Sequence, residues 1–521
     1  MRFLSKHIII VILIVGFLLR LWFLVVNDSH STDGIIFLFT ADYFRNPSIW
    51  PKVPPRFIMP IYPLLVFLTS FFTRGDIDIA GRWANMLIGV SMIMFVYRIS
   101  RRLFDKNVGL ISAVLISIDP LLIRHSSFDR SDLLFSLMTL VLAYFFWIIP
   151  WENSDYKQGM FFGFLLGISQ LTRPNASWYF LLFIIYWVIR IIKQHIPIRD
   201  FIIKTFIPVF SFFLVLTEAP YIYLRIIHYH PKNYFGQVLL GGFLIAKGVR
   251  EREGFQLNAN ATDFIAAEQA NRINFSDMFR WEIISTKYSY ALNYLYGYFN
   301  QSIWSYFHGW IIPVIIMLIF YVIMRKKVSG WNKIGYLFSF SLLLILLLPL
   351  TQVHEPYLLP LRPIAIIILS WFLTNFFSLK GFGIYGKAIS VIVTIAIIFT
   401  NLQNVYSLRE QEAQYINGYR YIGQYLKEVK NPGDAVMARN NSVFFYARMQ
   451  GYPLPSSPLD QTIKFCHFKG IKYLVFGPDE RRVRRAWEIE INARIKKGDE
   501  TFELIHERTY GEKYLVYRIN P

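Results

Sequence analysis

Long apolar runs separated by short basic segments make up most of this chain and leave few folds open to it. The first run extends from Ile8 to Val26, about long enough to cross a bilayer as one helix, and no small-x-small cleavage site follows it. It is therefore predicted to be a retained transmembrane helix. The other runs lie at 79–99, 108–123, 133–149, 160–171, 178–192, 201–224, 311–324, 334–350, 358–377 and 388–399. Together they predict about eleven spans.

The density of charged residues divides the chain into two predicted domains. Charged residues are 33 of the 119 residues from Gln403 to Pro521, but only 55 of the 402 residues before them. The first value is ordinary for a soluble domain and the second is not. Residues 1–402 are therefore predicted to form a polytopic α-helical membrane domain. Residues 403–521 are predicted to form a small soluble α/β domain, with strands at 434–438, 473–476 and 514–519 and helices at 415–429 and 479–495.

The basic segments also predict orientation. The net charge of +20 suggests nucleic acid only until it is mapped, because the basic clusters at 98–106, 190–193, 325–327 and 380–387 adjoin apolar runs. With a cytoplasmic N-terminus all of them lie inside, as the positive-inside rule requires. An odd number of spans then places the C-terminal domain outside a plasma or inner membrane. No nucleic-acid partner is expected. The proline-containing run at 57–72 is interpreted as interfacial or re-entrant helices.

Acidic residues follow the first and third spans on the predicted outer face. Asp33 precedes Gly34 just beyond the first span, where a carboxylate at a cavity rim could deprotonate an acceptor hydroxyl. Asp42 follows on what is predicted to be one short helix. Asp129 and Asp132 come after the third span, where charges beside apolar helices usually face a functional cavity. The alternatives are that a single loop Asp is a helix cap, and that Asp132 caps the fourth helix and pairs with Arg130.

Cations lie near the same predicted surface. Lys52 and Arg56 occur in a proline-rich stretch, and Arg173 follows the fifth span. Guanidinium and ammonium groups at this depth suit a lipid-linked phosphate, although snorkelling to headgroups explains each equally well. The segment 352–363 lies outside before the tenth span, and its polar residues suggest a cavity wall. They include His354, Glu355, Tyr357 and Arg362.

Metal ligands are not recognisable by their spacing. The single cysteine, Cys466, excludes an internal disulfide framework and any cysteine-cluster metal site. The histidines show no recognised ligand spacing. No residue is assigned to a metal, and a divalent metal is left open as a cofactor. In the C-terminal domain, the basic run at 481–485 is interpreted as a solvated helix face, with contact to anionic headgroups or an anionic acceptor as the alternative.

The order of these features resembles the GT-C glycosyltransferases, and among them the prokaryotic branch of the protein O-mannosyltransferase and aminoarabinose-transferase superfamily. The resemblance covers essentially the whole chain. It rests on Asp33 after the first helix, Pro54-Pro55-Arg56, Arg130-Ser131-Asp132, a Gly-x-x-x-Gly helix ending in Thr172-Arg173-Pro174, and Tyr357-Leu358-Leu359-Pro360. Two positions depart from the family pattern. Pro356 replaces an Arg that would contact the donor phosphate, a role open to Arg362 or His354, and Gly34 stands where some members have a second acid.

The resemblance implies an enzyme that moves a sugar from a polyprenyl-phosphate carrier to an extracytoplasmic acceptor, with inversion. The acceptor class, whether protein, glycan or lipid, is not implied. Asp33 would be the general base, and Asp132 would orient a cation or the acceptor. Arg56, Arg130, Arg173 and Lys52 would bind the phosphate. Asp42, Asp129, His354, Glu355, Tyr357 and Arg362 would line the donor or acceptor cavity. The main alternative is a transporter or flippase of lipid-linked saccharides, which would favour mid-membrane charges and internal repeats. A non-catalytic scaffold would not explain the outer acids.

Overall fold

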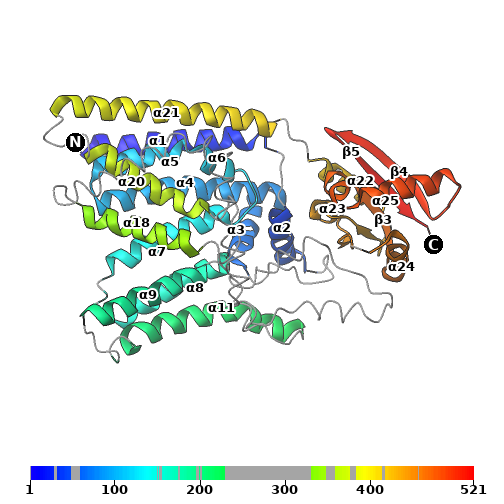
Figure 1. Cartoon of the computed structure of the whole chain (residues 1–521), viewed down its shortest axis with the longest axis horizontal. Helices are drawn as coiled ribbons and strands as arrows, with labels where there is room; N and C mark the ends of the chain where they lie inside the picture. The colour runs from blue at the N-terminus through cyan, green and yellow to red at the C-terminus, as the bar shows by residue number, and fades with distance from the viewer. Residues whose placement is uncertain are drawn as a thin grey trace. The chain divides into compact units, whose positions relative to one another are not determined.

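A computed structural model describes most of the chain (Figure 1). The described residues are 2–27, 32–47, 59–149, 151, 155–173, 176–194, 199, 202–228, 330–347, 358–375, 383–413, 417–455 and 457–520. The chain divides into two compact units. The first comprises 1–26, 57–246 and 279–410, and the second comprises 27–56, 247–278 and 411–521. The predicted boundary at residue 402, between a membrane domain and a soluble domain, stays a prediction.

Helices make up the described part of the first unit. Near the start of the chain they are α1 (Arg2–Leu24), α3 (Ile61–Ser70), α4 (Ile77–Leu103), α5 (Lys106–Ser117), α6 (Pro120–His125) and α7 (Asp132–Ile148). They continue as α8 (Tyr156–Thr172), α9 (Ser177–Gln194), the π-helical turn η5 (Ile202–Phe206), α11 (Ile207–His228), α18 (Trp331–Leu347), the 3-10 turn η12 (Leu359–Leu361), α20 (Arg362–Asn375) and α21 (Gly383–Ala413).

Aspartates begin several of these helices. The side chains of Asp76, Asp105 and Asp155 accept hydrogen bonds from backbone N–H groups in the first turns of α4, α5 and α8. Such caps satisfy donors that an isolated helix end leaves unpaired. Glycines then allow close helix packing. A Cβ at Gly163 of α8 would overlap the backbone of Val209 in α11, which explains the small-residue spacing on that helix.

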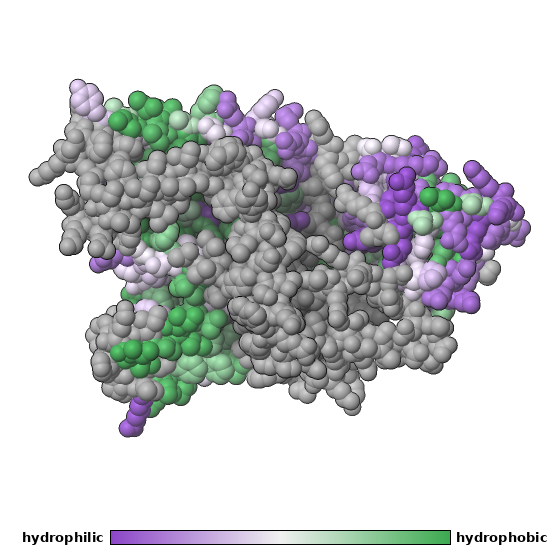
Figure 2. Space-filling view, in the orientation of Figure 1, coloured by the Kyte–Doolittle hydropathy of each residue, from purple (hydrophilic) through white to green (hydrophobic). Residues whose placement is uncertain are grey.

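Helices occupy every predicted apolar run that falls within the described residues; the run at 311–324 lies outside them. Three described helical segments are long and apolar enough to cross a membrane, namely His7–Leu24, Ile77–Leu103 and one that begins at Lys387. Six shorter apolar helices have 10–17 residues. The total of eleven spans therefore stays a prediction. In Figure 2 hydrophobic side chains face outward along α21, and they include Val391, Ile392, Ile395 and Phe399.

One predicted span is interrupted, so the single helix expected at 108–123 is wrong. Helix α5 ends at Ser117, and Asp119 caps the short helix α6, in which Pro120 is the first residue. Proline has no N–H to continue α5 but fits the first position of a new helix. The run at 57–72 contains α3, which has 10 residues and is too short to cross a bilayer.

The second unit contains α2 (Thr32–Arg45) and a five-stranded sheet with its helices. The strands are β1 (Ala435–Met437), β2 (Gln450–Tyr452), β3 (Ile471–Phe476), β4 (Phe502–Tyr510) and β5 (Glu512–Ile519), in the order β2-β1-β3-β5-β4. The helices are α22 (Gly418–Val429), α23 (Asn441–Ala447), α24 (Leu459–Lys469) and α25 (Pro478–Lys496). Strands β1, β2 and β3 pair in parallel, whereas β5 pairs antiparallel with β3 and β4.

Alternate residues of the central strands enter two apolar cores. In β5, Leu515 and Tyr517 join a cluster with Cys466 and Trp487 of α24 and α25. Tyr514 and Val516 join the other cluster, which contains Tyr419, Ile422 and Leu426 of α22 and Val443 and Ala447 of α23. Successive side chains of a strand point to opposite faces, so the sheet separates the two cores. The three predicted strands of this region overlap β1, β3 and β5.

Candidate active site

The segment between α6 and α7 carries the acids that follow the third predicted span. Asp129 lies in this segment and Asp132 is the first residue of α7, and both side chains are almost completely buried. Burying a carboxylate is unfavourable unless a cation or several hydrogen bonds compensate. The partners of these acids therefore define the candidate site.

Asp132 forms an ion pair with Arg173. Its Oδ1 atom accepts from Nη1 of Arg173, the residue that ends α8. The backbone N–H of Arg173 donates to Ser169 O of the same helix at 2.9 Å, which places the guanidinium at the helix end. Sequence reasoning offered Arg130 as the alternative partner of Asp132; the structure pairs Asp132 with Arg173. A carboxylate on α7 thus orients a guanidinium on α8.

The side chain of Asn85 in α4 donates hydrogen bonds to backbone carbonyls of the same segment. Its amide Nδ2 donates to Arg130 O at 2.7 Å, to Phe128 O, and to the Tyr62 hydroxyl at 3.1 Å. The Tyr62 hydroxyl in turn donates to Gly81 O at 3.3 Å. Helices α3 and α4 therefore fix the segment on which both acids lie.

Arg130 is a cation whose side chain is only partly buried. Its guanidinium carbon lies 5.5 Å from the centre of the Phe128 ring, and that of Arg124 lies 5.4 Å from the same ring. Two guanidinium groups on one aromatic ring gain cation–π attraction but repel each other. Within the described residues, Nε of Arg130 is buried and has no hydrogen-bond partner. This nitrogen is a donor that an anion could satisfy.

Arg362 belongs to a second buried ion pair. Its Nε donates to Oδ2 of Asp119 at 2.7 Å, and Oδ1 of Asp119 accepts from the Leu122 N–H at 3.0 Å to cap α6. The exposed fractions of the two side chains are 4% and 0%. The predicted cavity-wall residue Arg362 is therefore paired inside the helix bundle, and it joins the start of α20 to α6.

Arg20 of α1 is a buried cation that the sequence analysis did not single out. It donates to Ser126 Oγ at 3.2 Å and to the carbonyls of Gly16, Ser117 and Ile116 at 2.9, 3.1 and 3.2 Å. A charge inside an apolar run is itself a signal of function or of structural anchoring, and this signal could have found Arg20. Its bonds join α1 to the end of α5 and to the segment before α7.

The remaining predicted residues are on α2 or outside the described part of the chain. Asp42 is buried on α2, where its Oδ1 accepts from Asn46 Nδ2 at 3.4 Å. The backbone of Asp33 lies in the first turn of α2, and its side chain is outside the described part. Lys52, Arg56, His354, Glu355 and Tyr357 also lie outside the described residues. The structure thus brings together Asp132 and Arg173 directly, with Asp129 and Arg130 on the adjoining segment.

Metal-ligating side chains do not gather anywhere in the described ranges: no group of three or more His, Cys, Asp or Glu residues there could hold an ion. The chemistry of the described site is that of paired charges. Two buried carboxylates and two guanidinium groups at helix ends can orient hydroxyl groups and bind an anion.

Sequence and structure comparisons relate this chain to known proteins. Residues 59–221 match the family model described as dolichyl-phosphate-mannose-protein mannosyltransferase. This segment extends from α3 into α11 and contains Tyr62, Asn85, Asp129, Asp132 and Arg173. Comparison with curated proteins finds no significant match.

Solved structures share the fold at low sequence identity. ArnT from Cupriavidus metallidurans in the apo state is 10% identical, with 99% of each chain covered and a TM-score of 0.59. The same protein bound to undecaprenyl phosphate is 11% identical, with the same coverage and a TM-score of 0.57. The oligosaccharyltransferase AglB from Archaeoglobus fulgidus, in complex with an inhibitory peptide and a dolichol-phosphate, is 11% identical. Its TM-score is 0.57, with coverage of 98% of this chain and 74% of AglB. Residues 59–221 therefore match the dolichyl-phosphate-mannose-protein mannosyltransferase family model, and the chain as a whole shares the fold of ArnT and AglB.

Proposed function

We propose that this chain is a membrane glycosyltransferase that moves a sugar from a polyprenyl-phosphate carrier to an extracytoplasmic acceptor. The family match supports the reaction class, and the related structures with bound undecaprenyl phosphate or dolichol-phosphate support the lipid donor. The proposal includes about eleven spans, a cytoplasmic N-terminus and an extracytoplasmic α/β domain at the C-terminus.

The observation that carries the proposal is the buried charge cluster at the ends of α7 and α8. Asp132 pairs with Arg173, and Asp129 and Arg130 lie on the segment that Asn85 holds. Burying charged groups beside apolar helices costs free energy, and apolar residues at these positions would make the helix bundle more stable. In the proposed function, these groups bind a charged lipid-linked donor that enters from the membrane.

In the proposed reaction an acceptor hydroxyl attacks the anomeric carbon of the sugar. The new bond joins the hydroxyl oxygen to that carbon, while the bond between the carbon and the phosphate oxygen breaks. The hydroxyl proton passes to the Asp33 carboxylate, and the polyprenyl phosphate leaves with the bonding electron pair. Attack opposite the leaving group inverts the configuration. Departure adds negative charge to the phosphate, which fixed cations stabilise more strongly than they stabilise the ground state.

The cations have different supporting arguments. Arg130 has a buried nitrogen that can donate to a phosphate oxygen. Asp132 orients Arg173 toward the same end of the helix bundle. Lys52 and Arg56 are included from their positions in the sequence.

The proposed cavity residues are His354, Glu355, Tyr357 and Arg362, together with Asp42 and Asp129. The buried pair of Arg362 with Asp119 favours a supporting role for this arginine.

The test compares membranes that contain equal amounts of wild type, Asp33→Asn and Asp105→Asn. Asp105 is an exposed helix cap, and Asn caps a helix as well as Asp does, so this control carries the same chemical change outside the site. Extracted polyprenyl-phosphate sugars are supplied, and sugar release is followed by mass spectrometry. The wild type and Asp105→Asn are expected to release sugar, and Asp33→Asn at least ~100-fold less, since general base catalysis contributes about 10²–10⁴-fold.

Two results would count against the proposal. Equal release by Asp33→Asn and wild type would remove Asp33 as the base and leave Asp132 as the next candidate. A labelled donor that crosses the bilayer of a vesicle with its lipid linkage intact, without release, would indicate transport.

A further inference from the structure

Helix α2, which carries Asp33 in its first turn, packs against the apolar core of the C-terminal domain. The rings of Phe39 and Phe445 of α23 meet edge to face, with their centroids 5.3 Å apart and their planes at 77°. Phe39 packs on the cluster that contains Tyr419, Ile422 and Val443. Edge-to-face pairs add to the gain from burial. Helix α2, near the start of the chain, is therefore held by residues of the C-terminal domain.

A second anchor holds the chain before Asp33. Near the end of α1, the Trp22 ring stacks on Tyr406 of α21 at 6.4 Å, and the Arg409 guanidinium carbon lies 4.2 Å from the centre of the Trp22 ring. The next residue, Phe23, is fully buried against Val405 and Leu408 of the same helix. The end of α1 is thus held by α21, the helix that leads into the C-terminal domain.

Asp33 lies in the sequence between these two anchors. Phe39 follows it by six residues on the same helix, which corresponds to a rise of about 9 Å along the axis. Over so short a rigid stretch, the position of Phe39 determines the position of the Asp33 backbone. Both sets of partners come from residues 405–445, one from the end of α21 and the other from α22 and α23.

We infer that the C-terminal part of the chain is a positioning element for Asp33. Phe39 and Phe445 are positioning residues for the helix that carries the base. The inference rests on the proposed function, because it gives Asp33 the role of general base. It also gives the C-terminal domain a part in the transfer step.

The test uses full-length protein in nanodiscs with Phe39→Ala, Phe445→Ala and a control, Phe468→Ala. Phe468 is 60% exposed on α24 and belongs to neither core. Two measurements are made on each variant: hydrogen exchange of the peptide covering 32–45, and the transfer kinetics. Labelling of Cys466, the single cysteine and a fully buried one, reports whether the domain is still folded.

The first two variants are expected to exchange faster over 32–45 while Cys466 stays protected. Their kcat should fall on the order of 10- to 100-fold, since displacing a catalytic group by about 1 Å can cost 10²-fold. The donor KM should stay within about twofold, because the described cations of the proposed phosphate site, Arg130 and Arg173, are not on α2. Phe39→Leu keeps most of the apolar contact and should recover most of the lost kcat. Phe468→Ala should match the wild type in both measurements.

Each opposing result has a separate meaning. Unchanged exchange in Phe39→Ala would show that the ring pair does not anchor α2 and would overturn the inference. Faster exchange with unchanged kcat would show that the anchor does not position the base, and would overturn it too. If Phe445→Ala exposes Cys466, Phe39→Ala decides the matter, because Phe39 lies outside the sheet and its own helices. A fully active Asp33→Asn would instead overturn the proposed function, while the exchange data would still report the anchor.

Discussion

The ion pair between Asp132 and Arg173 is the residue contact with the largest expected effect. The exposed fractions of the two side chains are 2% and 13%. Asp132→Asn or Arg173→Gln alone should lower stability by about 3–5 kcal/mol, because each removes one member of a buried ion pair. The double variant has no charge to compensate and should recover much of this loss. Its transfer activity should stay low, because it also lacks the oriented cation. Thermal unfolding in detergent, with sugar release on the same samples, would measure both effects.

A strictly additive double variant would contradict this account, since it would mean that the two charges do not interact. Recovery of activity together with stability would show that the pair is only structural and would remove Arg173 from the phosphate site. The exposed pair of Arg518 with Glu503 provides the control, because exposed ion pairs contribute only about 0–1 kcal/mol.

Residues of the site differ in how far the sequence could reveal them. Asp129, Asp132 and Arg173 were predictable because charged residues stand out beside apolar runs. Asn85 and Tyr62 were not, because an Asn or Tyr in an amphipathic stretch is common and their bonds to Arg130, Phe128 and Gly81 join separate helices. The pairing of Arg362 with Asp119 spans 243 positions of sequence. Helix packing decides such contacts, and no spacing in a single sequence encodes them.

Secondary-structure elements were predictable where their patterns were strong. Apolar runs gave the helices of the first unit, and apolar strands gave β1, β3 and β5. Strand β4 was missed because it is a charged edge strand with only Phe502 buried. Strand β2 was missed because its three residues are only partly buried, whereas the three residues of β1 are buried. The basic run at 481–485 was interpreted as a solvated face. The structure instead gives Arg481 a bidentate partner in Glu488 and lets Arg484 donate to Pro455 O. Arg485 is exposed.

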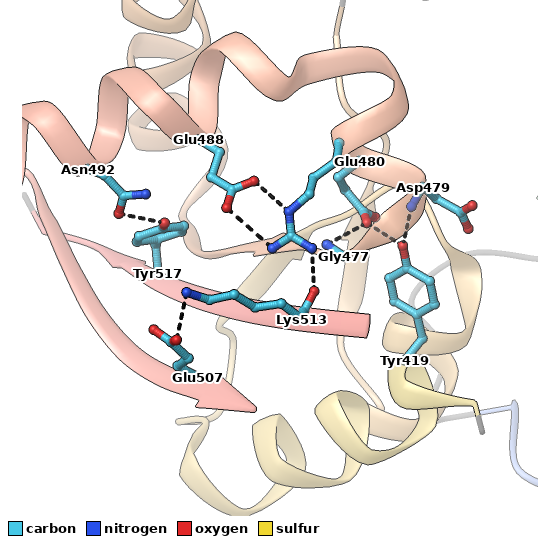
Figure 3. A network of polar contacts seen from close by, with 10 residues as sticks. Tyr419, Gly477, Asp479, Glu480, Glu488, Asn492, Glu507, Lys513 and Tyr517 are labelled. Carbon is cyan, nitrogen blue, oxygen red and sulfur yellow. Dashed lines mark hydrogen bonds and ion pairs between the residues drawn. The ribbon is translucent and has the colours of Figure 1, made fainter. Parts of the chain in front are cut away.

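The buried carboxylate of Glu480 joins four elements of the sheet domain, and Figure 3 shows its hydrogen bonds with Tyr419 and Gly477. It accepts from the Tyr419 hydroxyl at 2.5 Å and from the backbone N–H groups of Gly477, Arg439 and Asn440 at 2.9, 2.8 and 3.3 Å. These bonds connect the ends of β1 and β3 to α22 and α25. Burial raises the pKa of Glu480 above its ordinary 4.5, although the hydrogen bonds act in the opposite direction.

The raised pKa predicts how the stability of this domain depends on pH. The folded state holds the Glu480 proton more tightly than the unfolded state does. The stabilisation of the folded domain that comes from this tighter proton binding is complete below pH 4.5 and is lost as pH rises through the raised pKa of Glu480. Glu480→Gln should abolish this slope. It should also destabilise the domain by about 1–3 kcal/mol, because the amide NH₂ would face a backbone N–H whichever way it is turned. Cys466 labelling, relative to the urea-unfolded chain at the same pH, measures the change.

Tyr419→Phe provides the matched test of the same network. It removes the donor to Glu480 and the acceptor of the Asp479 N–H, a bond of 2.8 Å. It should therefore destabilise the domain, whereas Tyr421→Phe should not, since Tyr421 is 41% exposed and its ring stacks on Tyr510. Equal stabilities for the two variants would mean that the buried network contributes little.

For the whole molecule, the orientation in the membrane determines whether the proposed active site and its acceptor are on the same side. The basic segments predict that the end of α4 is cytoplasmic and the sheet domain extracytoplasmic. In a Cys466→Ser background, single cysteines replace Arg102 at the end of α4 or Glu500 in the sheet domain, both exposed. A membrane-impermeant maleimide should label Glu500→Cys in intact right-side-out vesicles, and Arg102→Cys only after permeabilisation. The reverse pattern would place the C-terminal domain inside and exclude transfer at the outer face. Labelling of both before permeabilisation would contradict the predicted arrangement of spans between them.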